Sequence, residues 1–192
     1  MKREPKIYFI SGVCGVGKTA SLKELKKKLS ETDYDIRDFD ERGVPDGGGP
    51  KWHTEETLNW LKIATENATN GKSTIVCGFQ NPEDFNKLYD HTEKIPATLI
   101  LLNASSDTIH QRLLGRYPTK ESILEINRAS GVPLDKFVAD IISFAPTLRD
   151  IFKNENYPII ETDNKTQEQV ANEIIKLLKY YVQKRSFSNY HQ

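Results

Sequence analysis

An octapeptide near the start of the chain has the residue types and spacing that bind phosphate. It reads Gly12-Val13-Cys14-Gly15-Val16-Gly17-Lys18-Thr19 and fits the pattern G-x-x-x-x-G-K-[ST]. Its glycines let the backbone wrap closely around an anion, and successive N–H groups then point inward. We expect Lys18 to reach the β- and γ-phosphates of a nucleotide and the Thr19 hydroxyl to hold Mg²⁺.

The segments on either side of this loop fit a phosphate site. The apolar run 7–10 predicts a buried strand, and residues 20–29, beginning with Ala20, predict a helix with leucines at helical spacing. A helix that starts at the loop adds partial positive charge for an anion. The alternative is a Gly-rich turn with a chance Lys-Thr pair, but both flanks favour a nucleotide site that includes Ala20.

Two carboxylates end the second predicted strand, which spans residues 34–40. Asp38 and Asp40 are two positions apart, so strand alternation places them on one face. We expect one of these carboxylates to order Mg²⁺-bound water, and the other to accept a proton from an acceptor hydroxyl or to orient it. The alternative is a solvated acidic strand end.

Other phosphate-loop classes lack their signatures here. A GTPase needs an Asn-Lys-x-Asp motif after a late strand, but the fourth predicted strand ends in Leu102-Asn103-Ala104-Ser105. Motor, helicase and AAA-type ATPases carry an acidic pair directly after an apolar strand, whereas the third strand ends in Val76-Cys77-Gly78-Phe79. These absences favour ATP as the donor and a small phosphotransferase as the class.

The chain resembles the nucleoside monophosphate kinase and shikimate kinase group of phosphotransferases. Its loop is the usual one of that group, and Asp38-Phe39-Asp40 is similar to the Asp-x-Asp of shikimate kinases. This likeness implies that Asp38 serves the magnesium and that Asp40 is the acceptor-side carboxylate. Arg112 and Arg116 resemble the lid arginines of adenylate kinases, of which the first packs on adenine and the second contacts phosphates. Asn164, after the last strand, is placed like the adenine-contacting loop. The resemblance implies ATP and Mg²⁺ as cofactors, with Arg116 among the catalytic residues.

The acceptor half departs from both families. Adenylate kinases carry Asp-Gly-Phe-Pro-Arg after the third strand, where residues 77–81 read Cys-Gly-Phe-Gln-Asn. The acid and the arginine that recognise a monophosphate are missing, and so is the triple glycine of shikimate kinases. Arg42, Trp52 and His53 lie where an acceptor would bind, although ordinary loop contacts also explain them. Arg128 and Arg149 are either further lid arginines or surface charges.

Composition restricts the class of protein further. The 192 residues carry 27 Lys and Arg against 27 Asp and Glu, so no basic footprint for nucleic acid is expected. The two cysteines do not form a disulfide framework, and the four histidines lack metal-ligand spacing. No segment suits a signal peptide or a membrane span. We expect a cytoplasmic monomer or homodimer that binds ATP and a small-molecule acceptor.

Strands alternate with helices along the whole sequence. We expect strands at 73–79, 96–102 and 158–162, and helices from Thr54, from Asn81, and over 107–115, 119–129, 134–144 and 166–184, with Pro146 as a break. This order predicts an α/β fold: three α/β/α layers around a five-stranded parallel sheet, with a helical lid. A single domain would have its core at 6–115 and 146–184, its lid and acceptor insertion at 116–145 and a tail at 185–192.

The leading hypothesis is an ATP-dependent kinase that phosphorylates a hydroxyl, or a phosphate, of a small metabolite, nucleoside or nucleotide. Lid closure by Arg116, with movement of segments 42–53 and 116–133, would exclude water from the site. One alternative is a nucleotide-binding regulatory ATPase without a small acceptor. Another is a 5′-hydroxyl kinase of nucleic acid, against which the neutral net charge argues.

Overall fold

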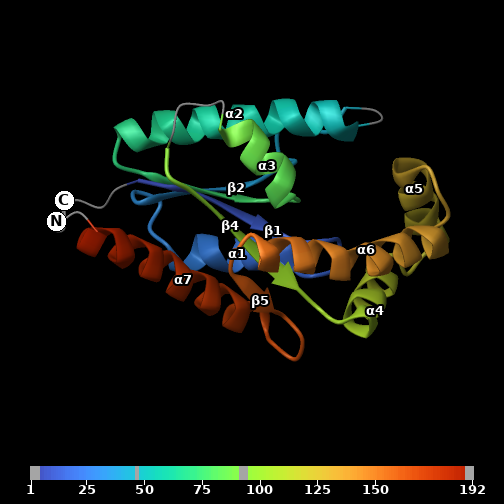
Figure 1. Cartoon of the computed structure of the whole chain (residues 1–192). Helices are drawn as coiled ribbons and strands as arrows, with labels where there is room; N and C mark the ends of the chain where they lie inside the picture. Colours follow the sequence, from blue (N-terminus) through green and yellow to red (C-terminus); the bar gives the residue numbers. More distant parts are fainter. Residues whose placement is uncertain (1–4, 46–47, 91–94, 189–192) are drawn as a thin grey trace.

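A five-stranded parallel sheet forms the centre of the molecule (Figure 1). The computed structural model describes residues 5–45, 48–90 and 95–188, and side chains as far as residue 181. The strands lie in the order β2-β3-β1-β4-β5. Their bounds are Ile7–Ser11 (β1), Tyr34–Asp38 (β2), Ser73–Cys77 (β3), Ala97–Asn103 (β4) and Ile159–Glu161 (β5).

Helices cover both faces of this sheet. They are α1 (Lys18–Lys28), α2 (Gly49–Thr69), α3 (Pro82–Tyr89), α4 (Ser106–Arg116), α5 (Lys120–Ser130), α6 (Leu134–Asn154) and α7 (Gln167–Ser188). Figure 1 shows α2 and α3 above the sheet and α1 and α7 below it, and α6 contacts α3, β4 and β5. Right-handed crossovers account for this division between the faces. The predicted three-layer α/β/α class is confirmed.

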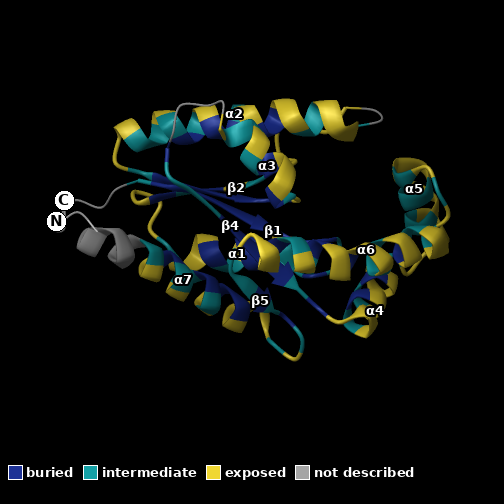
Figure 2. Cartoon of the chain, viewed as in Figure 1, coloured by how far each residue is buried: buried dark blue, intermediate teal, exposed yellow. Residues whose placement is uncertain are grey.

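The core lies along the middle strands. Every residue of β1 and β3 is buried, as Figure 2 shows in dark blue. A strand covered on both faces has apolar side chains throughout, which explains why the run 7–10 does not alternate. Burial of this kind fixes the carboxyl ends of the strands, where the phosphate loop and the carboxylates lie.

Helix α2 begins five residues before the predicted start at Thr54, so that prediction was wrong. Its first residue is Gly49, and Pro50 occupies the first turn, where the missing N–H of proline costs no hydrogen bond. The Thr54 hydroxyl donates to the Pro50 carbonyl at 3.0 Å and does not cap the helix. Trp52 and His53 consequently lie on a helix, whereas the sequence suggested a loop. The rest of the predicted loop includes residues 46–47, which lie outside the described residues.

Helix α6 continues through Pro146, where the sequence predicted a break. Proline inside a helix costs about 3 kcal/mol because one backbone hydrogen bond is lost. Ala145, Leu148 and Phe152 are buried around and after the proline, and their burial offsets that cost. Helix α7 likewise runs to Ser188, beyond the predicted end near residue 184; residues 189–192 of the predicted tail lie outside the described residues.

The predicted insertion corresponds to α5 and the first part of α6. Helix α5 contains no buried residue and lies beyond the sheet at one end of the molecule (Figure 1). Weak burial is typical of a segment that opens and closes. The division into a core and a lid stays a prediction. Within the described residues, no helix is long and apolar enough to cross a bilayer.

Candidate nucleotide and acceptor site

The phosphate loop joins β1 to α1 in a conformation that its glycines permit. Gly12, Gly15 and Gly17 have φ of 150°, 87° and 104°, values that other residues rarely adopt. A Cβ on Gly12 would lie 2.5 Å from the Leu102 carbonyl oxygen of β4. The loop is therefore pressed against the neighbouring strand, and its backbone curves as phosphate binding requires.

Lys18 lies inside this curve at the first residue of α1. Its Nζ donates to the carbonyls of Gly12 at 2.7 Å and Val13 at 3.0 Å. Burial lowers the pKa of Lys18, while Cys14, Cys77, Asp40 and Asp38 act in the opposite direction. A desolvated ammonium is poorly compensated by carbonyl dipoles, so an anion that enters the loop gains a strong interaction. Thr19 follows with an exposed side chain.

Asp38 and Asp40 lie beside this lysine, but the predicted strand 34–40 ends at Asp38, so strand alternation does not set the direction of the Asp40 side chain. Asp40 follows β2 in a turn, where the backbone N–H of Asp40 donates to Asp38 Oδ1 at 3.1 Å. Both carboxylates contribute to the electrostatic field at Lys18. One ammonium and two carboxylates thus converge at the carboxyl ends of β1 and β2, the edge at which ligands bind in parallel sheets.

The environment of Asp40 favours its protonated form. Partial burial raises the pKa of Asp40, the neighbouring Asp38 and Glu56 raise it further, and Lys18 and His53 counteract them. The side chain remains exposed to solvent, so an acceptor can reach it. A carboxylate with a raised pKa is a stronger base than an ordinary aspartate, which suits proton abstraction.

Arg112 connects α4 to both the phosphate loop and the end of β5. Its guanidinium donates to the carbonyls of Gly15 and Val16 at 3.3 Å, and to the hydroxyl and carbonyl oxygens of Thr162 at 3.0 Å. Thr162 also donates to the Val16 carbonyl at 3.1 Å. The sequence analysis missed Thr162 because a threonine at the end of a strand gives no recognisable motif.

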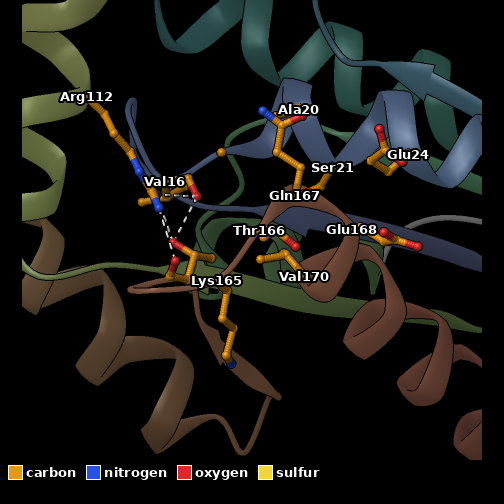
Figure 3. A pocket seen from close by; sticks show the side chains of 12 residues that line it. Val16, Ala20, Ser21, Glu24, Arg112, Lys165, Thr166, Gln167, Glu168 and Val170 are labelled. Carbon is orange, nitrogen blue, oxygen red and sulfur yellow. Dashed lines mark hydrogen bonds between the residues drawn. The ribbon is translucent and has the colours of Figure 1, made fainter.

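A pocket of about 720 Å³ opens beside this network. Figure 3 shows Arg112 reaching from α4 towards Val16, with the start of α7 on the opposite side. Four residues that the sequence predicted for the nucleotide site line this pocket: Val16, Gly17, Ala20 and Arg112. The other lining residues, which were not predicted, are Ser21, Glu24, Thr162, Lys165, Thr166, Gln167, Glu168 and Val170. The pocket is large enough for a nucleoside and adjoins the helix N-terminus that would hold the phosphates.

Asn164 and Arg116 lie at the margins of this arrangement. Asn164 is in the turn after β5 with φ of 55°, between the lining residues Thr162 and Lys165, but is not a lining residue itself. Asp163 holds this turn to the start of α4, because its carboxylate accepts from the backbone N–H and hydroxyl of Ser105. Arg116 is exposed at the end of α4, with its guanidinium 5.7 Å from the centre of the Tyr117 ring.

The other candidate arginines have different surroundings. Arg149 on α6 pairs with Glu161 of β5 at 3.1 Å, which ties the helix to the sheet edge. Arg128 is exposed on α5. Arg42 pairs at 3.0 Å with Glu56, a buried carboxylate of α2 that the sequence analysis did not single out. A lone glutamate in a helical pattern carries no sign that it will be buried.

Five rings form a continuous series beside Asp40, which we call the aromatic row: Phe39, Trp52, His53, Phe79 and Phe144. His53 stacks on Phe39 with centroids 4.9 Å apart and interplanar angle 27°. Its Nε2 lies 2.8 Å from the Phe79 carbonyl oxygen, to which it donates. The sequence did not predict that Phe144 joins this row, because it lies on α6, far along the chain.

Gly78 permits this row to form. A Cβ at this position would lie 2.1 Å from Cβ of Phe39, so Gly78→Ala forces the end of β3 away from the end of β2. We expect a loss of about 1–3 kcal/mol in the free energy of unfolding, measured by denaturant titration. Gly115→Ala is the control, since no atom lies within 4 Å of its Cβ position in α4. It should stabilise the protein by about 0.5–1 kcal/mol. Equal effects of the two changes would contradict this packing.

The donor groups fit a magnesium ion that arrives with a nucleotide. In the described part of the chain, no three His, Cys, Asp or Glu side chains gather as metal ligands. Mg²⁺ in phosphotransferases takes one or two protein ligands and completes its shell with water and phosphate oxygens. The Thr19 hydroxyl and the Asp38 carboxylate are hard oxygen donors of the required kind, so the residues present fit this metal.

Comparisons with known proteins concern the chain as a whole. No family model matches the chain. The chain is 28% identical over 181 residues to a Pyrococcus furiosus protein named "Putative adenylate kinase", covering 93% of this chain and 87% of that one. A Thermococcus gammatolerans protein of the same name is 27% identical over 184 residues, covering 93% and 89%.

Solved structures share the fold. A shikimate kinase from Acinetobacter baumannii in complex with shikimate aligns with TM-score 0.55 and 15% identity, covering 94% of this chain and 96% of that one. The crystal structure of APE1195 aligns with TM-score 0.59 and 18% identity, covering 95% and 99%. These likenesses concern the fold, an α/β fold of the P-loop kinase type. Together with the relatives, they support the nucleoside monophosphate kinase and shikimate kinase-like group that the motifs predicted.

Proposed function

We propose that the protein is an ATP-dependent phosphotransferase that moves the γ-phosphate to a hydroxyl of a small metabolite or nucleoside. The relatives support a small-molecule kinase in general terms. The choice of a hydroxyl as acceptor rests on Asp40, which is exposed beside Lys18 and has a raised pKa. A phosphate acceptor is already ionised and needs no such base, whereas a hydroxyl benefits from one.

Each residue has a separate part in this proposal. The N–H groups of the loop and Lys18 hold the β- and γ-phosphates, and the pocket beside Arg112 receives the base of the nucleotide. Magnesium, when bound through Thr19 and Asp38, supplies neutralising charge at the phosphate oxygens. Asp40 accepts the proton of the acceptor hydroxyl, and Arg116 closes over the transferring group from the end of α4. Positioning and charge neutralisation account for most of the rate in such transfers.

The raised pKa of Asp40 gives a pH dependence with a definite sign. Asp40 acts only when ionised, so kcat/KM falls as pH drops through its pKa, and that fall should lie above the ordinary aspartate value of about 3.9. Asp38→Asn removes a neighbouring charge that raises this pKa, so the fall should move to lower pH at saturating Mg²⁺. Asp33→Asn, at the exposed entry to the same strand, is the control. A profile unchanged by Asp38→Asn would contradict the assignment.

The proposal is tested by ADP formation from Mg-ATP with and without pooled acceptors: nucleosides, nucleotides, sugar acids, polyols and aminoglycosides. We expect one pool to raise ADP release well above the rate with water alone. Tight binding of ATP without stimulation by any pool would contradict the proposal and favour a regulatory ATPase.

A further inference from the structure

The aromatic row presents ring surface where an acceptor would bind. Phe79 and Phe144 are each 37% exposed, with centroids 6.1 Å apart, and come from the end of β3 and from α6. Trp52 is half-buried next to them, whereas Phe39 beneath is 1% exposed. Exposed phenylalanines from two separate elements that meet in this way offer a surface on which a planar ring can stack.

The charges beside the row are unsuited to an anion. Three carboxylates lie in this region: the Asp40 N–H donates to Asp38 Oδ1 at 3.1 Å at the end of β2, and Glu56 is buried on α2, the helix that carries two rings of the aromatic row. Arg42 is already paired with Glu56, and Lys18 is enclosed by the phosphate loop. An acidic acceptor would have to draw Arg42, whose side chain is 48% exposed, away from Glu56, which leaves the buried Glu56 carboxylate unpaired.

The side chain at position 81 also provides no positive charge for an anionic acceptor. Asn81 stands where adenylate kinases carry the arginine that recognises a monophosphate. Its side-chain oxygen accepts from the backbone N–H of Glu83 at 3.0 Å and so caps α3. The nearby Lys51 is 91% exposed and lies 3.9 Å from Glu55 on the solvent side of α2. An acidic group of the acceptor therefore finds no cation held ready at Asn81, Lys51, Lys18 or Arg42.

From these observations we infer that the acceptor is a hydroxyl compound that carries an aromatic ring and no negative charge, as a nucleoside does. This inference rests on the proposed function, because it assumes that phosphate is transferred beside Asp40. The ring stacks on Phe79 and Phe144, the hydroxyl lies at Asp40, and the Arg42–Glu56 pair opposes phosphorylated or carboxylated analogues.

The test compares matched acceptors on the wild-type protein. Nucleosides, their 5′-monophosphates, free ribose and shikimate are supplied one at a time with Mg-ATP, and phosphorylated product is measured by mass spectrometry. We expect kcat/KM for a nucleoside to exceed that for its monophosphate, for ribose and for shikimate by at least about tenfold, since one lost stacking or charge contact is worth roughly that factor. Preference for ribose or shikimate would overturn the inference and leave the proposed function intact, whereas preference for a monophosphate with transfer to its phosphate would overturn both. Activity with none of the four would overturn the inference, and the pooled acceptors would then decide the proposed function.

Single substitutions test the stacking on the phenylalanines and the effect of the Arg42–Glu56 pair separately. Phe79→Leu and Phe144→Leu should each raise the acceptor KM about tenfold with kcat nearly unchanged, whereas Tyr180→Leu, an exposed ring on α7, should change neither. Glu56→Gln releases Arg42 and should narrow the preference for nucleoside over monophosphate several-fold. Glu55→Gln, one position earlier and exposed, is its control. Unchanged KM in both phenylalanine variants, or an unchanged preference in folded Glu56→Gln, would contradict the inference.

Discussion

Lys18→Ala is expected to abolish nearly all turnover, with a fall in kcat of about 10²–10³-fold, the range in which removal of one preorganised donor lies. Lys18 is the cation within the phosphate loop, and burial lowers its pKa, so its charge is poorly compensated until phosphate binds. That charge acts most strongly when negative charge spreads over the transferring group. Steady-state ADP formation at saturating ATP and acceptor measures the loss.

The matched control for this change is Lys23→Ala, an exposed lysine on the next turn of α1. It should keep the wild-type rate. Burial disfavours the charged form of Lys18, so the Lys18→Ala change should lower the thermal midpoint of unfolding less than the truncation of an apolar core side chain would. A folded Lys18→Ala protein with more than about a tenth of the wild-type rate would contradict the role of the loop, since one donor is worth at least about 10²-fold.

Asp40→Asn is expected to lower kcat by about 10²–10⁴-fold, the usual range for a general base, and to leave the affinity for ATP within a few-fold. The substitution keeps the size of the side chain and removes its ability to accept a proton. Since Asp40 is exposed beside the aromatic row and is not part of the phosphate loop, nucleotide binding does not depend on its charge directly.

Asp38→Asn provides the contrast, because the two carboxylates have different proposed tasks. It should raise the Mg²⁺ concentration needed for half-maximal rate and recover in part at high Mg²⁺, whereas Asp40→Asn should not recover. Titration of the rate with Mg²⁺ at fixed ATP separates the two variants. Full activity of Asp40→Asn, or its rescue by Mg²⁺, would show that Asp40 is not the acceptor-side base.

The phosphate-loop half of the candidate site could be placed from the sequence because its signals are local. The order of residues 12–19 specifies a turn that only glycines permit, and the apolar run before it and the leucines after it fix a strand and a helix. Asp38 and Asp40 could be placed beside the loop because parallel strands end at one edge of a sheet. Each of these inferences needs only a few consecutive residues and the rules of sheet topology.

The acceptor half depends on contacts between distant residues. Phe79 meets Phe144, and Arg42 meets Glu56, through packing that no periodic pattern records. Pro146 was read as a break because the burial that holds α6 together comes from other elements. The start of α2 was placed too late because Gly49 and Pro50 resemble loop residues until the helix that follows is known.

The central claim, phosphoryl transfer to a small acceptor, is tested most directly with ATP labelled in the γ-phosphate. The measurement is the fraction of label that reaches an organic product and the fraction that appears as inorganic phosphate, with the best acceptor present. We predict that most of the label enters the organic product, and that Asp40→Asn lowers this transfer while ATP still binds. Label released only as inorganic phosphate, with every acceptor tried, would contradict the claim.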